Sequence, residues 1–257
     1  MAIMITMANV KGGVGKTTTA LALAAGLQKA GKRVLMIDAD HQCNTTYEYG
    51  AQVEGAPTFY DILFGGLTAK ECIQTTDHGD IIAGDEQLES ADSTMTASPR
   101  MYKYVKKAIA GIQKDYDYII VDTHPETGVV MGNILMASDY LVCPIECKTY
   151  ALQALAKMYK VVQEYKEDNP TLSIMGILII KYQRRYKQTQ ETEEALPRYA
   201  EALGTRLFKA KIRDTVSVSK AQDNRIPLFD FAPSSTAAQD YMEFVNEVLS
   251  ITEGKED

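Results

Sequence analysis

The 257-residue chain lacks the features of a membrane-spanning or disulfide-stabilised protein. It has no apolar run near the ~20 residues that a membrane-spanning helix requires. No basic segment precedes its apolar N-terminal run, so the sequence predicts no secretion signal. The four cysteines show no disulfide framework and no complete metal-binding pattern. We therefore expect a cytoplasmic protein with no membrane partner.

Internal repeats and low-complexity segments are also missing. The apolar fraction of 46% and charged fraction of 24% are ordinary for a globular protein. A chain of this length can bury a large core, so we expect one domain spanning residues 1–257. The net charge of −7 argues against attraction of the whole molecule to nucleic acid. However, residues 181–225 hold 11 Lys/Arg against 6 Asp/Glu, so positive charge is concentrated in one stretch.

A glycine-rich loop lies between an apolar run at residues 3–8 and an alanine-rich helix former at residues 20–25. It reads Lys11-Gly12-Gly13-Val14-Gly15-Lys16-Thr17-Thr18. Backbone N–H groups in such a strand–loop–helix setting can surround a phosphate. Lys16 can then reach the β- and γ-phosphates, and the Thr17 hydroxyl can bind Mg²⁺. The loop departs from the plain G-x-x-x-x-G-K-[ST] pattern, because Val10 replaces its first glycine.

Two other apolar runs end in aspartates. Residues 34–37 precede Asp38 and Asp40, and a strand at residues 116–122 ends in Asp122. Ligands of open parallel sheets lie at the carboxyl ends of the strands, where Asp122 can meet Mg²⁺ through water. A solvated strand end is the alternative for Asp38 and Asp40. The order of these motifs predicts a three-layer α/β/α P-loop NTPase fold with a mostly parallel twisted sheet of about seven or eight strands.

The rest of the chain is divided by its apolar pattern. We expect further strands at residues 80–84, 139–144, 174–180 and 206–212. We expect helices at residues 58–63, 151–167, 190–203 and 236–251, and one that starts at Pro99. Residues 90–98 are polar and predict a loop.

The loop's K-G-G-x-G-K-T-T form resembles the deviant Walker A box of the ParA/MinD family of ATPases. The resemblance covers residues 3–249, and it implies ATP and Mg²⁺ as cofactors. It implies that Lys11 reaches across an ATP-bound homodimer to the partner's phosphates. Residues 38–44 are similar to the family's D-x-D-P-Q-x-N, which implies that Asp40 orients the attacking water and that Asp38 supports the Mg²⁺ shell.

Three places depart from the family's pattern or match it loosely. His41 stands where the family has proline, and His124 stands at the first proline of D-x-P-P. Arg213 and Asp214 correspond to the loop beside the adenine, which implies base contacts.

The resemblance also implies a role in segregating plasmid, chromosome or mobile-element DNA. Short family members without an N-terminal extension bind DNA non-specifically in the ATP state, which implies a nucleoid-associated protein. Hydrolysis is slow until a ParB-like centromere-binding partner stimulates it. The residues implied in DNA binding are Arg184, Arg185, Lys187, Lys220 and Arg225; ordinary solvated charge is their alternative.

Three other functions share part of this sequence pattern. A MinD-like membrane ATPase needs a basic amphipathic C-terminal helix, but residues 240–257 are acidic. An electron-transfer protein like the nitrogenase iron protein needs cluster-binding cysteines at positions this chain lacks. A ParA-like ATPase that positions a protein cargo without binding DNA stays open on sequence alone.

Overall fold

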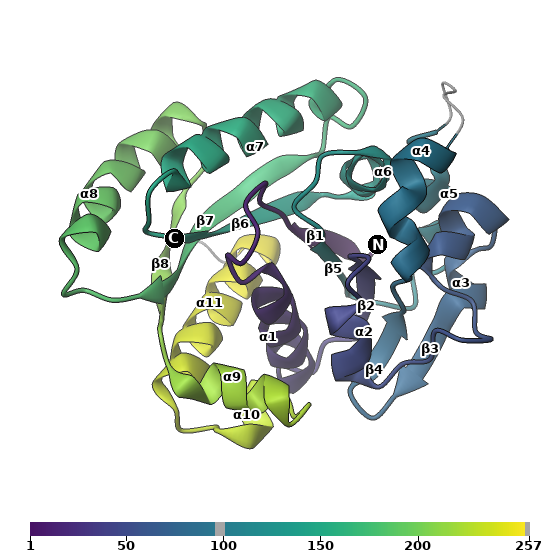
Figure 1. Ribbon diagram of the computed structural model, residues 1–257, viewed down its shortest axis with the longest axis horizontal. Helices are drawn as coiled ribbons and strands as arrows, with labels where there is room; N and C mark the ends of the chain where they lie inside the picture. Colours follow the sequence, from purple (N-terminus) through teal and green to yellow (C-terminus); the bar gives the residue numbers. More distant parts are fainter. Residues whose placement is uncertain (96–100, 255–257) are drawn as a thin grey trace.

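The computed structural model describes residues 1–95 and 101–254 and shows a central sheet with helices on both faces (Figure 1). Within these residues the sheet has eight strands in the order β3-β4-β2-β5-β1-β6-β7-β8. β3 runs antiparallel to β4, and the other neighbouring pairs are parallel. The expected P-loop NTPase fold is therefore confirmed.

The strands follow the apolar runs closely. They are β1 (Ile3–Met7), β2 (Val34–Ala39), β3 (Ile73–Thr76), β4 (Gly79–Ile82), β5 (Tyr118–Thr123), β6 (Tyr140–Glu146), β7 (Ser173–Tyr182) and β8 (Leu207–Arg213). The α-helices are α1 (Lys16–Lys29), α2 (Asn44–Tyr49), α3 (Ala69–Cys72), α4 (Ala91–Thr94), α5 (Tyr104–Ile109), α6 (Val129–Ala137), α7 (Ala151–Lys166), α8 (Lys187–Ala202), α9 (Val216–Asp223), α10 (Leu228–Phe231) and α11 (Thr236–Thr252). A π-helix (Asp61–Gly65) and a 3₁₀-helix (Glu86–Ser90) complete the described elements.

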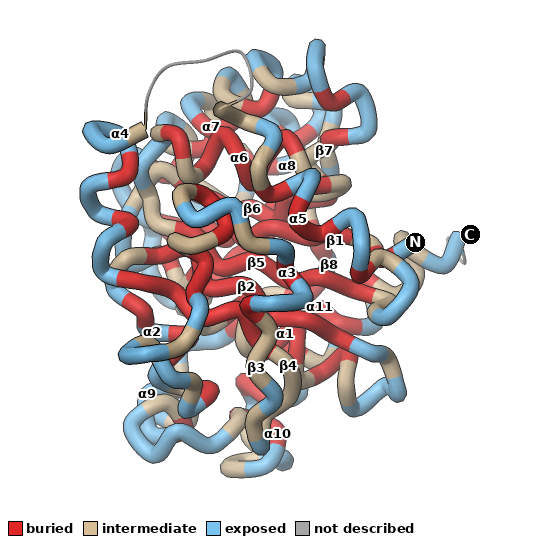
Figure 2. The backbone as a smooth tube through the Cα atoms, turned by 90° about the vertical axis from the view of Figure 1, so that its right-hand side faces the viewer, coloured by how far each residue is buried: buried red, intermediate tan, exposed pale blue. Residues whose placement is uncertain are grey.

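Alternating side chains of the strands build a core on each face of the sheet. In β1, Ile5 and Met7 pack with α1 and α11, whereas Met4 packs with α5 and α6 on the opposite face. Helices α7 and α8 cover the same opposite face over β6 and β7. Buried residues accordingly follow the strands through the middle of the molecule (Figure 2).

Helix α1, which begins at the glycine-rich loop, packs closely against α11. A Cβ atom at Gly26 would lie 2.5 Å from Cγ2 of Val245, so a side chain there would push the two helices apart. The Ser235 side chain accepts a hydrogen bond from the N–H of Ala238 (3.2 Å) and caps α11. The close approach at Gly26 therefore holds α1 directly against α11.

Several elements differ from the sequence-based expectation. β3 and α6 were not expected, and residues 90–94 are helical rather than loop. Helix α8 begins at Lys187, three residues before its expected start. The predicted helix start at Pro99 lies outside the described residues, and α5 is described from Tyr104. Of the helices described, none has the length and apolar content to cross a membrane.

Candidate functional site

The glycine-rich loop joins β1 to α1 in a conformation that only glycine adopts easily. Gly13 and Gly15 have φ angles of +73° and +68°. A Cβ atom at Gly15 would also lie 2.8 Å from Cδ1 of Ile180. Asn9, which sequence reasoning missed, fixes the start of the loop: its side chain accepts from the N–H of Lys11 (3.0 Å) and donates to the carbonyl of Pro144 (2.8 Å).

A cavity of about 470 Å³ opens beside this loop, at the carboxyl ends of the strands. Lys16 lines it although the residue is only 6% exposed. Burial lowers the pKa of Lys16, while Asp122 and Asp40 oppose that effect. The other residues of the predicted site that line the cavity are Gly12, Gly13, Gly15, Thr17, Thr18, Asp40, Arg213 and Asp214.

Asp38 and Asp122 lie side by side because β2 and β5 pair them in register. Burial raises the pKa of both carboxyl groups, and the charge of Asp122 raises that of Asp38 further. Asp38 accepts from the N–H and hydroxyl of Thr46 (2.8 and 2.7 Å) and from the N–H of Asp40 (3.1 Å). The residues of α2 that hold these carboxylates were not identified from the sequence.

Asp122 is the carboxylate that fits a metal ion. Its Oδ2 accepts from the Thr45 hydroxyl (3.0 Å), but its buried Oδ1 has no hydrogen-bond partner among the described residues. A carboxylate oxygen left free in this way, with the Thr17 hydroxyl near it, is the kind of ligand that Mg²⁺ prefers. The donor set therefore fits the predicted magnesium site.

Asp40 lies at the edge of the cavity and is 6% exposed. One of its oxygens accepts from the N–H of Gln42 (2.9 Å). His124 also lines the cavity, and its ring centroid is 4.1 Å from that of His41. Burial lowers the pKa of His124, while the charge of Asp40 opposes the shift.

The two lysines of the loop point in different directions. Lys16 faces the cavity, whereas Lys11 is absent from its lining. The Lys11 ammonium instead donates to the carbonyl of Thr149 at 3.5 Å, in the segment after β6. Gln188 at the start of α8 holds the same residue, donating to the Thr149 hydroxyl at 2.8 Å.

Arg213 and Asp214 lie at the end of β8, across the cavity from the loop. The backbone N–H and the Nε of Arg213 each donate to Asp240 at 2.9 Å, and Asp214 accepts from Gln183 at 2.6 Å. Their predicted base contacts stay a prediction. Lys181, another residue that sequence reasoning missed, donates to the carbonyl of Gly13 (3.0 Å) and so links β7 to the loop.

The predicted DNA-binding residues fall in two segments at one edge of the sheet. Arg184, Arg185 and Lys187 follow β7, and Lys220 lies on the helix after β8; all four are exposed. β7 and β8 run parallel, so the chain leaves both at the same edge. DNA contact itself stays a prediction.

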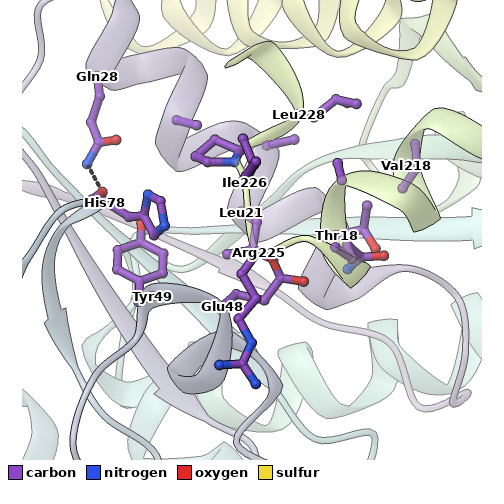
Figure 3. A pocket seen from close by; sticks show the side chains of 15 residues that line it. Thr18, Leu21, Gln28, Glu48, Tyr49, His78, Val218, Arg225, Ile226 and Leu228 are labelled. Carbon is purple, nitrogen blue, oxygen red and sulfur yellow. Dashed lines mark hydrogen bonds between the residues drawn. The ribbon is translucent and has the colours of Figure 1, made fainter. Parts of the chain in front are cut away.

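Arg225, the fifth of these residues, lines a separate and mostly apolar cleft of about 50 Å³ between α1, α2 and α9 (Figure 3). Figure 3 shows it beside Glu48. Burial raises the pKa of Glu48 to about 7, although Gln222 and Arg225 both act to lower it. Arg225 is therefore placed differently from the other four basic residues.

The fold, the glycine-rich loop and the strand-end aspartates together define a P-loop nucleoside triphosphatase. Comparison with known proteins narrows this class. Residues 2–174 match the family described as AAA domain. The sporulation initiation inhibitor protein Soj of Bacillus subtilis is 32% identical over 254 residues, which cover 97% of this chain and 99% of that protein. The chromosome partitioning protein ParA of Caulobacter vibrioides is 28% identical over 253 residues, covering 96% of this chain and 94% of that protein.

A solved structure has the same fold as this chain. The cobyrinic acid a,c-diamide synthase of Mycobacterium smegmatis, with bound ADP and magnesium, superimposes with a TM-score of 0.84. It is 25% identical and covers 100% of this chain and 97% of that chain. The protein belongs to the ParA/Soj family of ATPases, as its sequence predicts.

Proposed function

We propose that this protein is a Mg²⁺-dependent ATPase switch that forms a homodimer in the ATP state and partitions plasmid, chromosome or mobile-element DNA. The observation that carries the proposal is the separation of the two loop lysines. Lys16 is buried in the cavity, where it can contact the phosphates of a nucleotide bound to the same chain. The Lys11 ammonium instead lies outside the cavity, at Thr149. A cation placed there can exchange its long, exposed hydrogen bond to Thr149 for a phosphate of a nucleotide in a second copy.

The chemistry follows from the residues that surround the cavity. Backbone N–H groups of residues 12–18 bind the phosphates, and Lys16 offsets the charge that spreads over the γ-phosphoryl oxygens. Mg²⁺ held through Thr17 and Asp122, with Asp38 in support, supplies further charge neutralisation. Asp40 accepts a hydrogen bond from the attacking water and orients it.

Release of the γ-phosphate then loosens the dimer, because Lys11 of each copy loses the group that it binds. Large side chains exposed near the site support a docking surface. Tyr150, Tyr186 and Val216 are 67%, 62% and 68% exposed, and each follows the carboxyl end of one strand, β6, β7 or β8. Exposed apolar groups gathered at one edge are typical of protein–protein contacts.

A Lys11→Ala variant tests the dimer. We expect sedimentation velocity with ATP to show a dimer for the natural protein and a monomer for Lys11→Ala, while the affinity of the monomer for a fluorescent ATP analogue changes little. Lys29→Ala, at the opposite end of α1, is the matched control and should still form dimers. An ATP-dependent dimer of Lys11→Ala would contradict the role given to this lysine.

DNA binding is tested by its dependence on salt. Non-specific contacts to phosphates release counterions, so ATP-dependent binding should weaken steeply as salt rises. Arg185→Ala should weaken binding and reduce the salt dependence, whereas Arg198→Ala, an exposed arginine on α8, should do neither. A DNA partner that acts in this way would place the ATP-bound protein on the nucleoid, and a ParB-like partner would accelerate hydrolysis.

The net charge of −7 favours one alternative, a ParA-like ATPase that positions a protein cargo without DNA. That function predicts no DNA binding at any salt concentration, with ATP-dependent dimerisation retained. The salt titration therefore separates the two functions.

A further inference from the structure

Three side chains with metal-binding atoms meet at the edge of the nucleotide cavity. Asp40, His41 and His124 each offer one such atom, and these atoms all lie within 4.8 Å of one another. The two imidazole rings are tilted by 37°, with their centroids 4.1 Å apart. The chain has only three histidines, and two of them are in this cluster.

The backbone itself creates the cluster. Parallel strands β2 and β5 pair Ala39 with Thr123, so the residues that follow them, Asp40 and His124, leave the sheet side by side. The Gln42 N–H holds one oxygen of Asp40. Because strand register fixes two of the three ligands, the cluster is a defined feature of the fold rather than a chance meeting of surface side chains.

An unsatisfied atom points to a ligand. Nδ1 of His124 is buried and has no hydrogen-bond partner among the described residues. Buried imidazole nitrogens are normally hydrogen-bonded or bound to a metal. The ring that carries this unpaired nitrogen belongs to the same cluster as the carboxylate of Asp40 and the ring of His41.

The charge on one side of the cluster favours a cation, whereas Lys16 lies on the other side, in the nucleotide cavity. His41 and His124 also line a smaller cavity of about 100 Å³, next to the nucleotide cavity. Glu89, Asp92 and Glu126 line it too, and the described lining includes no lysine or arginine. This second cavity gives an ion a negatively charged route of entry and leaves room for water as an additional ligand.

We propose that Asp40, His41 and His124 bind a transition-metal dication of the zinc class, and that the bound ion inhibits ATP hydrolysis. Two imidazoles and one carboxylate suit zinc, cobalt or nickel, whereas Mg²⁺ prefers oxygen alone. Bonds of about 2.0–2.2 Å in tetrahedral geometry place ligand atoms about 3.4 Å apart, so modest side-chain rotations complete the site. The inhibition rests on the proposed function, because the bound ion would occupy the Asp40 carboxylate that orients the attacking water.

Cobalt absorption tests the site directly, without nucleotide. Titration of the full chain with Co²⁺ should produce visible absorption bands of a tetrahedral site that saturate at one ion per chain and disappear when Zn²⁺ is added. His41→Gln and His124→Gln should each weaken Co²⁺ binding at least ~10-fold, the lower range for loss of groups that support a metal site. His78→Gln, which changes the third histidine beside Tyr49, should bind as the natural protein does.

Two controls keep this test decisive. Thermal unfolding of each variant checks folding, and half-buried His41 provides a second variant should His124→Gln fail to fold. Cys43→Ser checks the nearby thiol, whose Sγ donates to the carbonyl of His41 at 3.5 Å. No cobalt bands, equal binding by all histidine variants, or binding lost only in Cys43→Ser would each overturn the proposed site.

Steady-state ATPase assays test the inhibition. With excess Mg²⁺ and ATP, micromolar Zn²⁺ should slow the natural protein and His78→Gln but not His41→Gln, while binding of the ATP analogue stays unchanged. The comparison at equal zinc removes any effect of zinc on ATP itself. Cobalt binding without zinc inhibition would overturn the regulatory role, whereas cobalt binding by a protein with no ATPase activity would instead contradict the proposed function.

Discussion

The ion pair between Arg213 and Asp240 offers a quantitative test of the structure. Asp240 on α11 is almost buried, with 7% of its side chain exposed, and accepts from both the backbone and the guanidinium of Arg213. Hydrogen bonds to charged groups contribute about 1.5–3 kcal/mol. Alanine regains about 0.6 kcal/mol through its higher helix propensity. We therefore expect Asp240→Ala to lower the free energy of unfolding by about 2 kcal/mol.

Asp230→Ala is the matched control, because Asp230 is also helical and also ion-paired. Its partner Lys29 is 2.9 Å away, but the two side chains are 57% and 46% exposed. Such a pair contributes little, so the control should change stability by less than about 0.5 kcal/mol. In thermal unfolding followed by circular dichroism, Asp240→Ala should lose about 4–8 °C in Tm. Equal losses in the two variants would refute the reasoning that burial of Asp240 determines the difference.

Three further changes test the site. Asp40→Ala should retain ATP-dependent dimers in sedimentation but release no phosphate. Loss of the dimers would mean that Asp40 is needed for ATP binding rather than for hydrolysis. Asp122→Asn should raise the Mg²⁺ concentration for half-maximal ATPase activity at least ~10-fold, because a neutral amide is a poorer ligand; an unchanged magnesium titration would count against this ligand. Burial raises the pKa of Glu48 from 4.5 to about 7, so the folded state resists ionisation of this carboxyl group. The free energy of unfolding therefore falls as pH rises between these two values. Above pH 7, Glu48→Gln should therefore be more stable by about 1 kcal/mol after allowance for solvent screening, an advantage that fades toward pH 4.5 in urea titrations.

Much of the fold was predictable because five of its strands are buried apolar runs of the sequence. The runs at β1, β2, β5, β6 and β7 are largely apolar, with Thr6 and Gly176 as exceptions inside them, and each leads to a turn or a charged residue. That Asp38 and Asp122 lie near the same edge of the sheet follows from the same pattern, since both stand near the carboxyl ends of parallel strands. The pairing of β2 with β5, which sets the two side by side, does not follow from it. The glycine-rich loop was equally clear, because its φ angles require glycine at positions 13 and 15.

Other elements left no clear pattern in the sequence. Helix α6 is buried around most of its surface, from Val129 to Met136, so it shows no apolar and polar faces. Strand β3 is only partly buried at the edge of the sheet, which removes the alternation that marks a strand. The contact of His41 with His124 joins loops that are distant in the sequence, so spacing alone could not reveal it.

The hydrogen bond from Lys181 to Gly13 has a consequence for communication within the molecule. Lys181 adopts a φ of +49°, unusual for a residue with a side chain, and Arg184 follows it three residues later. One short tether thus joins the glycine-rich loop to the start of the exposed segment that holds Arg184, Arg185 and Lys187. A shift of the Gly13 carbonyl during the nucleotide cycle would be passed to that segment without any domain rearrangement, and a Lys181→Met variant that still binds DNA only with ATP would show that this tether is dispensable.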